Sequence, residues 1–265
     1  MSKILISLVT HSSYVDVCEN FIELFKKNWK YDHEKFDFIV SVIGEQKTFK
    51  NCEVYYHGRE KTLPSAIYDI CVRGEYQYCI SFLGDAFINS KIDDYMIFEI
   101  IETMQKFEID YCCLIPKMAW MGITKKINNY MRLISNRDSY SVSFVAFIAT
   151  RKFILSEFKN GISDLDFEVK YLKKALDKYE LYPDKAMLCN NLFGILPGIE
   201  AGKWNRHALK KMKKKNPEIK FTKREKLSIR SQFKSDICHM LQTFLTRKQI
   251  VFLKKNLGID FFTQN

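Results

Sequence analysis

Asp85 is the residue whose position most directly suggests chemistry, because it follows eight nearly unbroken strand-forming residues, 76–83. A buried strand that ends in Gly84-Asp85 places this carboxylate at the rim of a sheet, where Gly84 permits close backbone approach. Mg²⁺ typically uses one or two carboxylates together with phosphate oxygens. The pattern predicts a divalent-cation site, for Mn²⁺ or Mg²⁺, with Asp85 as the metal ligand. The competing interpretation is an ordinary turn or helix-cap aspartate.

A second group of acids lies in residues 163–168, Ser-Asp-Leu-Asp-Phe-Glu. In the structural interpretation, these carboxylates are favoured by the dipole at the start of a helix. In the catalytic interpretation, one of them removes a proton from an attacking hydroxyl within hydrogen-bond reach. Asp166 and Glu168 are the two candidates, and their spacing alone does not choose between them.

The elements that must position these residues follow from the hydrophobic pattern. Apolar runs typical of strands occur at residues 4–9, 36–43, 54–56, 76–83, 111–115 and 141–149, and helical spacing occurs at 15–29, 63–72, 92–107, 151–158 and 164–176. This alternation predicts a mixed, mostly parallel α/β sheet flanked by helices. Ligands of such sheets bind beyond the carboxyl ends of the strands, where residues 10–13, 41–46 and 84–85 are polar.

Two local features accompany this pattern. Ser13, with Asp16 three residues later, resembles a capping box at the start of the first helix. Residues 119–138 show no clear period and are expected to form a loop across the edge of the sheet. These features predict how the first strand ends and how the far edge of the sheet is closed.

The composition, with 265 residues and a 47% hydrophobic share, is that of a globular protein with a full-sized core. The eight cysteines form no C-x-x-C pair, and most lie in apolar runs, which predicts buried free thiols and no zinc site. No run approaches the ~18 apolar residues of a membrane span, and the N-terminus is typical of a first strand instead of a signal peptide. We therefore expect a cytoplasmic protein.

Several common site motifs are missing from the sequence. There is no G-x-G-x-x-G and no G-x-x-x-x-G-K-[ST], which disfavours a Rossmann dinucleotide site and a P-loop. There is also no G-x-S-x-G, which disfavours a serine hydrolase of that type. A nucleotidyltransferase shares the α/β plan, but residues 10–13 after the first strand lack its Gly/Lys/Arg-rich phosphate loop.

Positive charge is concentrated at the end of the chain. Residues 203–265 hold 17 Lys or Arg and 4 Asp or Glu, whereas residues 1–202 hold 25 and 27. Five of the six residues 210–215 are lysines. We therefore predict a domain spanning residues 1–205 and a basic α-helical C-terminal extension spanning residues 206–265.

Four segments in this order resemble bacterial GT-A glycosyltransferases of surface polysaccharide and lipopolysaccharide-type glycan biosynthesis. They are residues 4–29, residues 78–88 with the sequence FLGDAFI near their end, residues 140–149 together with 164–168, and residues 198–204 with the sequence GIEAGKW. The second segment is similar to the acidic DxD region of that family, although Gly84 stands where its first acid would be. The fourth is similar to a late G-K-W element that closes over the diphosphate.

The resemblance implies a GT-A-like fold and transfer of a sugar from a nucleoside-diphosphate sugar to a cell-surface glycan or lipid-linked acceptor. It implies inversion of configuration, with Asp166 or Glu168 as the base. The donor would be held by a set of residues from several segments: Val9, Thr10, Arg59, Asp85, Lys203, Trp204 and His207. Negative charge on the departing phosphate would be met by a cation on Asp85, or by Lys203, Arg206 and His207, each of which also fits an ordinary solvated position.

The basic C-terminal region has three interpretations. Its lysines and a helical stripe of apolar residues fit a peripheral contact with anionic lipid at the inner face of the cytoplasmic membrane. The same stripe fits packing against the rest of the chain or against a second subunit in a homo-oligomer. Nucleic-acid binding is the alternative function of a different class, since lysines interleaved with aromatic residues are also its footprint.

Overall fold

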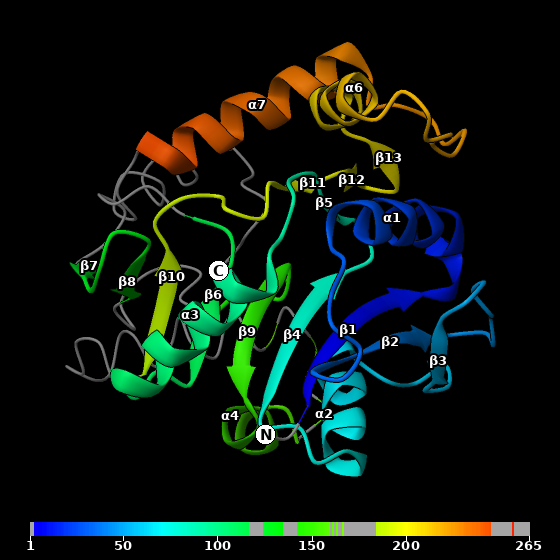
Figure 1. Ribbon diagram of the computed structural model, residues 1–265. Coiled ribbons are helices and arrows are strands. Elements are labelled where there is room, and N and C mark those ends of the chain that lie inside the picture. The colour runs from blue at the N-terminus through cyan, green and yellow to red at the C-terminus, as the bar shows by residue number, and fades with distance from the viewer. Residues whose placement is uncertain are drawn as a thin grey trace.

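The computed structural model describes residues 3–116, 124–134, 142–159, 161, 163, 166, 184–244 and 256. Its strands are β1 (Ile4–His11), β2 (Phe36–Ile43), β3 (Glu53–Tyr56), β4 (Tyr78–Leu83), β5 (Ala86–Ile88), β6 (Tyr111–Cys113), β7 (Thr124–Lys126), β8 (Met131–Ile134), β9 (Ala146–Thr150), β10 (Lys185–Leu188), β11 (Ile195–Pro197), β12 (Ile199–Glu200) and β13 (Lys203–Trp204). Its helices are the short η1 (Ser12–Tyr14), then α1 (Val15–Asn28), α2 (Leu63–Arg73), α3 (Asp94–Lys106), α4 (Arg151–Glu157), α6 (Arg206–Lys215) and α7 (Ile229–Phe244). Figure 1 shows these elements around a central sheet.

Nine strands form the main sheet in the order β3-β2-β1-β4-β9-β6-β10-β8-β7. Every antiparallel pair in this sheet includes β8 or β9, so the other seven strands point in one direction. The predicted mixed, mostly parallel α/β sheet flanked by helices is confirmed. Its parallel half, β3-β2-β1-β4, places the carboxyl ends of four strands along one edge.

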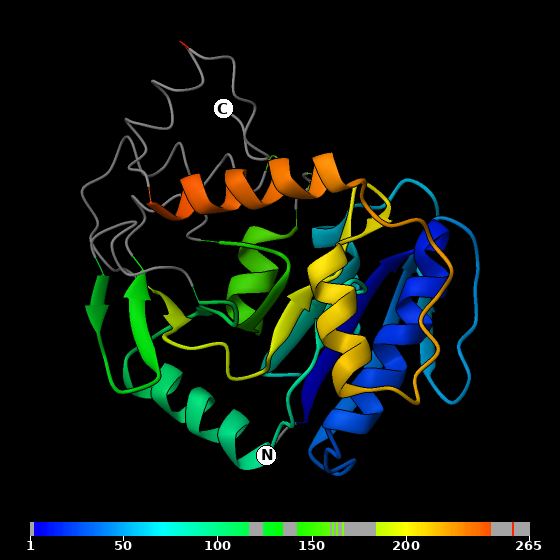
Figure 2. The ribbon, with the colours of Figure 1, turned by 90° about the horizontal axis from the view of Figure 1, so that it is seen from above.

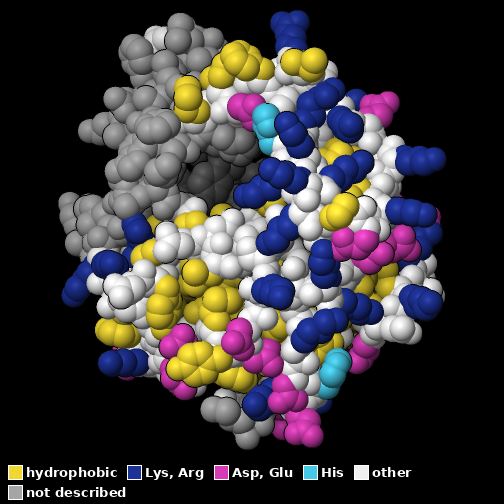
Figure 3. All heavy atoms as spheres, turned by 45° about the horizontal axis from the view of Figure 1, so that its top comes forward, with side chains coloured by type: hydrophobic (Ala, Val, Ile, Leu, Met, Phe, Trp, Pro, Cys, Tyr) yellow, Lys and Arg dark blue, Asp and Glu magenta, His cyan; other side chains and the backbone are white. Residues whose placement is uncertain are grey.

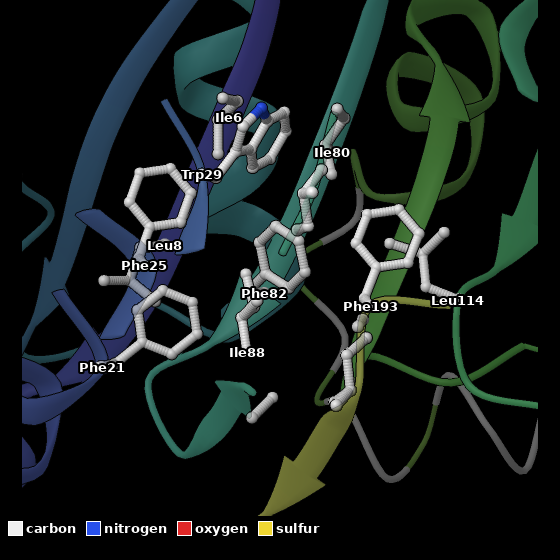
Figure 4. Packing of buried hydrophobic residues seen from close by; sticks show 14 of the residues in the cluster. Ile6, Leu8, Phe21, Phe25, Trp29, Ile80, Phe82, Ile88, Leu114 and Phe193 are labelled. Carbon is white, nitrogen blue, oxygen red and sulfur yellow. The ribbon is translucent and has the colours of Figure 1, made fainter. Parts of the chain in front are cut away.

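Both faces of the sheet are covered, because two hydrophobic clusters lie on opposite sides of it. One cluster combines alternate residues of β1, β2 and β4 with α1, α3 and α6, and the other combines the intervening residues with α2 and α4. In Figure 4 the rings of Phe21, Phe25 and Trp29 lie against Leu8 and Ile6 of β1, and that of Phe82 extends from β4. Burial on both faces explains why these strands are continuously apolar in sequence.

Most predicted elements are confirmed, and β2 matches the predicted 36–43. All eight cysteines are free thiols, also as predicted. The predicted loop at 119–138 was wrong where it is described, because β7 and β8 pair there as antiparallel strands at the sheet edge. Strands of three and four residues, as these are, are too short to show a clear hydrophobic period. Within the described residues, no helix is long and apolar enough to cross a membrane.

The predicted capping box was also wrong. α1 begins at Val15 after Tyr14, which makes no side-chain cap, and the 3-10 turn before it is capped by the His11 side chain accepting from the Ser13 N–H. Asp16 has a distant partner instead, Arg224. The carboxylate of Asp16, which the local spacing assigned to a helix cap, thus forms a long-range ion pair instead.

The first part of the basic C-terminal region is packed onto the sheet. Ala208, Leu209 and Met212 of α6 are buried in the same cluster as α1 and β1, together with Phe221. Figure 2 shows α6 lying alongside α1. The predicted division at 205/206 therefore runs between Trp204 and α6, both of which belong to one hydrophobic cluster.

Candidate functional site

A pocket of about 360 Å³ opens at the carboxyl ends of β1 and β4. Its lining comes from the end of β1, the following turn, the start of α2, the end of β4 and the β12–β13 turn: Val9, Thr10, His11, Tyr14, Leu63, Leu83, Gly84, Asp85, Ile199 and Ala201. This is the edge at which parallel α/β sheets bind ligands. The structure thus brings together three of the predicted donor-site residues, Val9, Thr10 and Asp85.

The floor of the pocket is the junction between β1 and β4. Val9 is paired in register with Leu83, and the Gly84 N–H donates to the Val9 carbonyl at 2.9 Å. A Cβ on Gly84 would lie 2.9 Å from Thr10 Oγ1, closer than real Cβ contacts allow. Gly84 is thus required by the approach of β1, and that approach is what holds Thr10 beside Asp85.

Asp85 is half-buried at this pocket, and its backbone carbonyl accepts from the Gly198 N–H at 2.9 Å. Burial raises the pKa of its carboxyl to about 6, against which its own backbone N–H works. Among the described residues no Lys or Arg forms an ion pair with it. Desolvation without a compensating cation is the physical cause of the raised pKa.

The wall of the pocket beyond β1 is held by a segment from far along the chain. Arg224 forms charge-assisted hydrogen bonds of 2.7 Å to both oxygens of Asp16 and also donates to the Ser13 carbonyl. Its guanidinium lies 4.5 Å from the ring centroid of Tyr14, which lines the pocket. Burial works to raise the pKa of Asp16, but hydrogen bonds from Arg224 and Thr222 outweigh it and hold that pKa below its usual value.

The opposite wall is the β12–β13 turn, which carries Ile199 and Ala201 into the lining. Ala201 has a φ of +48° and Gly202 a φ of +76°, so the turn places a non-glycine residue in the left-handed region. Glu200, between the two lining residues, accepts a 2.8 Å hydrogen bond from Ser235 of α7. Helix α7 is therefore attached to the rim of the pocket.

The remaining predicted donor residues do not line this pocket. Trp204 is fully buried, packs against Phe87 and Phe221, and donates its indole N–H to the Thr222 carbonyl. Three predicted cations are exposed and paired with acids: Lys203 with Glu225 at 2.6 Å, His207 with Asp236 at 3.0 Å, and Arg59 with Glu45 at 3.6 Å. Trp204 thus packs in the core here, and the three cations lie at the surface.

The two candidate bases are only partly described. Asp166 is exposed and accepts a 2.8 Å hydrogen bond from the Ser163 hydroxyl, whose oxygen accepts in turn from the Asp166 N–H. This reciprocal pair is the arrangement expected at a helix start. Glu168 lies outside the described residues.

Five residues of the lining were predicted neither to bind the donor nor to lie in the polar runs that end the strands: Tyr14, Leu63, Leu83, Ile199 and Ala201. The polar run 10–13 marked the end of β1, so His11 could be found from it, but Tyr14 looked like the first residue of an apolar helix face. Ala201 carries no chemical signal of its own. These positions can be recognised as pocket residues only from the tertiary structure, because segments distant in the sequence form the pocket together.

A metal ion at this site would need most of its coordinating atoms from a bound substrate and from water. No group of three or more His, Cys, Asp or Glu side chains within the described ranges could enclose a metal ion. Asp85 alone could contribute one carboxylate oxygen, which fits Mg²⁺ or Mn²⁺ bridged to phosphate oxygens and water and does not fit an all-protein metal cage.

No protein-family model matches this chain, and no curated protein matches it significantly in sequence. Among solved structures it is similar to Staphylococcus aureus TarS 1-349, with 10% identity and a TM-score of 0.44 over 70% of this chain and 60% of that one. It is also similar to a cytidylyltransferase from Leptospira borgpetersenii, with 10% identity and a TM-score of 0.43 over 100% of this chain and 99% of that one. The chain thus spans 60% of the TarS fragment, and at these TM-scores neither likeness carries an argument about activity.

Proposed function

We propose that this protein is a glycosyltransferase that binds a nucleoside-diphosphate sugar in the pocket between β1 and β4. The observation that carries the proposal is Asp85, a half-buried carboxylate at the carboxyl edge of a parallel sheet with no described cationic partner. An acid in that position is unfavourable for the isolated protein. A ligand that brings positive charge to it would remove the penalty.

The lining also argues for the kind of ligand. Its described residues include Asp85 but no Lys or Arg, so a free diphosphate placed beside Asp85 would be repelled. Asp85 would instead hold a divalent cation, which would supply the positive charge needed to attract the diphosphate and to stabilise it as it departs. Thr10 and the backbone at Gly84 would then hold the ligand beside Asp85, and Tyr14 offers a ring face.

The chemical step requires a base on the acceptor side. In this proposal Asp166 or Glu168 removes the proton from the acceptor hydroxyl, and the reaction inverts the anomeric configuration. Asp166 would have to exchange its bond to Ser163 for one to the acceptor. Asp166→Asn and Glu168→Gln, measured separately, should identify the base as the variant that loses turnover while keeping donor binding.

The acceptor is proposed to be a cell-surface glycan or lipid-linked sugar, reached at the inner face of the cytoplasmic membrane. Lys203 and His207 would assist only after leaving Glu225 and Asp236, their present partners. Arg59, exposed beside Glu45, would likewise have to turn toward the donor. These roles require the surface to rearrange when the donor binds.

The test is a thermal-shift panel of UDP, GDP, CDP and CMP, each with Mn²⁺, with Mg²⁺ and with chelator. A ligand at about a hundred times its Kd should stabilise the protein by roughly 2.7 kcal/mol. We expect one diphosphate to raise the Tm only when a cation is present, and Asp85→Asn to abolish the shift. Glu75→Gln, at an exposed acid away from the pocket, is the matched control. A shift of equal size in Asp85→Asn would exclude Asp85 as the cation ligand, and no shift with any nucleotide would overturn the proposal.

A further inference from the structure

Helix α7 exposes three of its large apolar side chains and buries two polar ones. Ile229, Phe233 and Met240 are 77%, 65% and 51% exposed. At 100° per residue these three positions fall within about 40° of one another around the helix, so they form one stripe. Figure 3 shows hydrophobic side chains along the top of the molecule, where α7 runs. A water-facing helix would ordinarily turn this stripe toward the core.

The opposite side of α7 is held to the protein by hydrogen bonds. Gln232 and Ser235 are almost completely buried. The Gln232 side-chain oxygen accepts from the Arg206 N–H at 2.8 Å, and the Ser235 hydroxyl donates to Glu200 at 2.8 Å. These hydrogen bonds determine which side of α7 faces the rest of the protein. The apolar stripe is therefore exposed because the polar side of the helix is bonded to α6 and β12.

The surroundings of the stripe are basic. Arg230 and Lys234 lie beside it on α7. The preceding α6 and the segment after it carry further exposed lysines, Lys210, Lys211, Lys213, Lys214, Lys220, Lys223 and Lys226, against two exposed acids, Glu218 and Glu225. Figure 3 shows dark-blue Lys and Arg side chains near the hydrophobic side chains at the top of the molecule. On α7 itself one acid, Asp236, lies on the same side, and its oxygens accept from Gln232 and contact His207. Both carboxylate oxygens of Asp236 thus have side-chain partners.

We propose that the stripe of Ile229, Phe233 and Met240 is a docking surface for an anionic lipid membrane. Apolar side chains of this kind enter the boundary between headgroups and acyl chains, while neighbouring Lys and Arg are attracted to negatively charged headgroups. Charge complementarity selects this occupant, because anionic headgroups attract the neighbouring Lys and Arg side chains, whereas a neutral apolar partner would make no use of their charge. The proposal rests on the transferase function only in supplying a lipid-linked acceptor.

A hydrogen bond from α7 connects the proposed docking surface to the rim of the pocket. Glu200, which accepts from Ser235, lies between the pocket residues Ile199 and Ala201. His207 of α6 contacts Asp236 of α7. A membrane bound along α7 would therefore lie beside the β12–β13 wall, and an acceptor held in that membrane would approach the pocket from its rim.

Vesicle sedimentation tests the proposal without any nucleotide or sugar. The full chain is mixed with vesicles of phosphatidylcholine alone or with phosphatidylglycerol added. We expect partition into the anionic vesicles only, a more than tenfold weaker partition for Ile229→Gln/Phe233→Gln/Met240→Gln, and roughly a fivefold loss for each charge removed by Arg230→Gln and Lys234→Gln. Tyr95→Gln and Lys125→Gln/Lys126→Gln, at exposed positions elsewhere, are controls that should bind normally.

Several outcomes would overturn the docking proposal. The first is that the protein does not bind anionic vesicles, and the second is that the triple variant binds them as well as the wild type does. The third is that the protein does not bind vesicles but forms a concentration-dependent dimer, which the triple variant abolishes. Loss of nucleic-acid binding in the lysine variants, with no vesicle binding, would favour the nucleic-acid alternative. The nucleotide thermal shift is measured separately, so the transferase proposal can fail while membrane docking stands, and the reverse.

Discussion

At the residue scale, two aspartates near the pocket show how a partner decides the behaviour of a carboxylate. Asp16 is bonded by Arg224 and Thr222, and its pKa lies below the usual value despite burial. Asp85 is desolvated by burial with no described cation beside it, and its pKa rises to about 6. The first is a structural ion pair, whereas the second has its charge free for a ligand.

From the raised pKa of Asp85 we predict how the stability of the protein changes with pH. The pKa of Asp85 in the folded protein lies above the unfolded value of about 4. Between these two pKa values the folded state therefore binds a proton that the unfolded state has released, and this stabilising contribution is lost as pH rises through about 6. Without ligand, Asp85→Asn should therefore be more stable than the wild type at pH 7, by roughly 1–2 kcal/mol after allowing for partial exposure.

This difference should disappear below about pH 4, where both forms are neutral. The measurement is urea unfolding of both proteins between pH 4 and 8, with Glu75→Gln as the control that should show no such crossover. A wild type that is as stable as Asp85→Asn at every pH would show that the carboxylate is not desolvated. Cation-dependent nucleotide binding should strengthen over the same pH range, as the carboxylate ionises.

At the scale of elements, the pocket depends on how closely β1 approaches β4 and on a strap, defined here as residues 216–227, that crosses from α6 to α7. The strap bonds to α1 through Asp16 and Asn20 and to the turn after β1 through Ser13. The strand pair thus forms the floor, and the strap holds one wall.

The floor can be tested with Gly84→Ala. The added Cβ would lie 2.9 Å from Thr10 Oγ1, and a β-branched side chain has little freedom to move away. We expect a loss of about 1–3 kcal/mol in the free energy of unfolding, together with weaker nucleotide binding. Ser81→Ala, on the strand β4 that Gly84 follows, removes a buried hydroxyl with no partner among the described residues and should be neutral or slightly stabilising. Equal effects of the two substitutions would argue against the steric account.

The wall can be tested with Arg224→Gln. Its guanidinium bonds Asp16 and covers the Tyr14 ring, so removing it leaves a partly buried carboxylate without its cation. We expect the free energy of unfolding at pH 7 to fall by about 1–3 kcal/mol, and the difference from the wild type to shrink as pH falls and Asp16 protonates. Lys223→Gln, at the exposed neighbouring position, should change little. An unchanged stability for Arg224→Gln would mean that the strap does not hold the wall.

At the scale of the whole molecule, the basic C-terminal region contains two kinds of helix. α6 inserts Met212 into the main hydrophobic cluster, where it is fully buried, whereas α7 leaves Met240 at 51% exposure. The +13 excess of residues 203–265 is thus carried partly by an element that the core needs. Stability and membrane docking should be separable functions of the same region.

Two methionine substitutions test that separation. Met212→Ala should cost about 2–5 kcal/mol as a core cavity and lower the Tm of the whole protein in one transition. Met240→Ala should change the free energy of unfolding by no more than about 0.5 kcal/mol but weaken vesicle binding. Scanning calorimetry and vesicle sedimentation measure the two effects. A separate low-temperature transition in Met212→Ala would show instead that α6 unfolds independently of the sheet.

The sequence by itself determined the α/β plan and the position of Asp85 at a strand end, because strands buried on both faces require continuous apolar runs that local periodicity reveals. Only the tertiary structure decided the rest of the rim. Asp16 and Arg224 are 208 positions apart, and no local pattern encodes their pairing. Amphipathic spacing showed that α7 has an apolar side but not that it faces outward, since Gln232 and Ser235 make that choice through partners on other elements. Likewise, only the structure showed that Trp204 packs against Phe87 and Phe221.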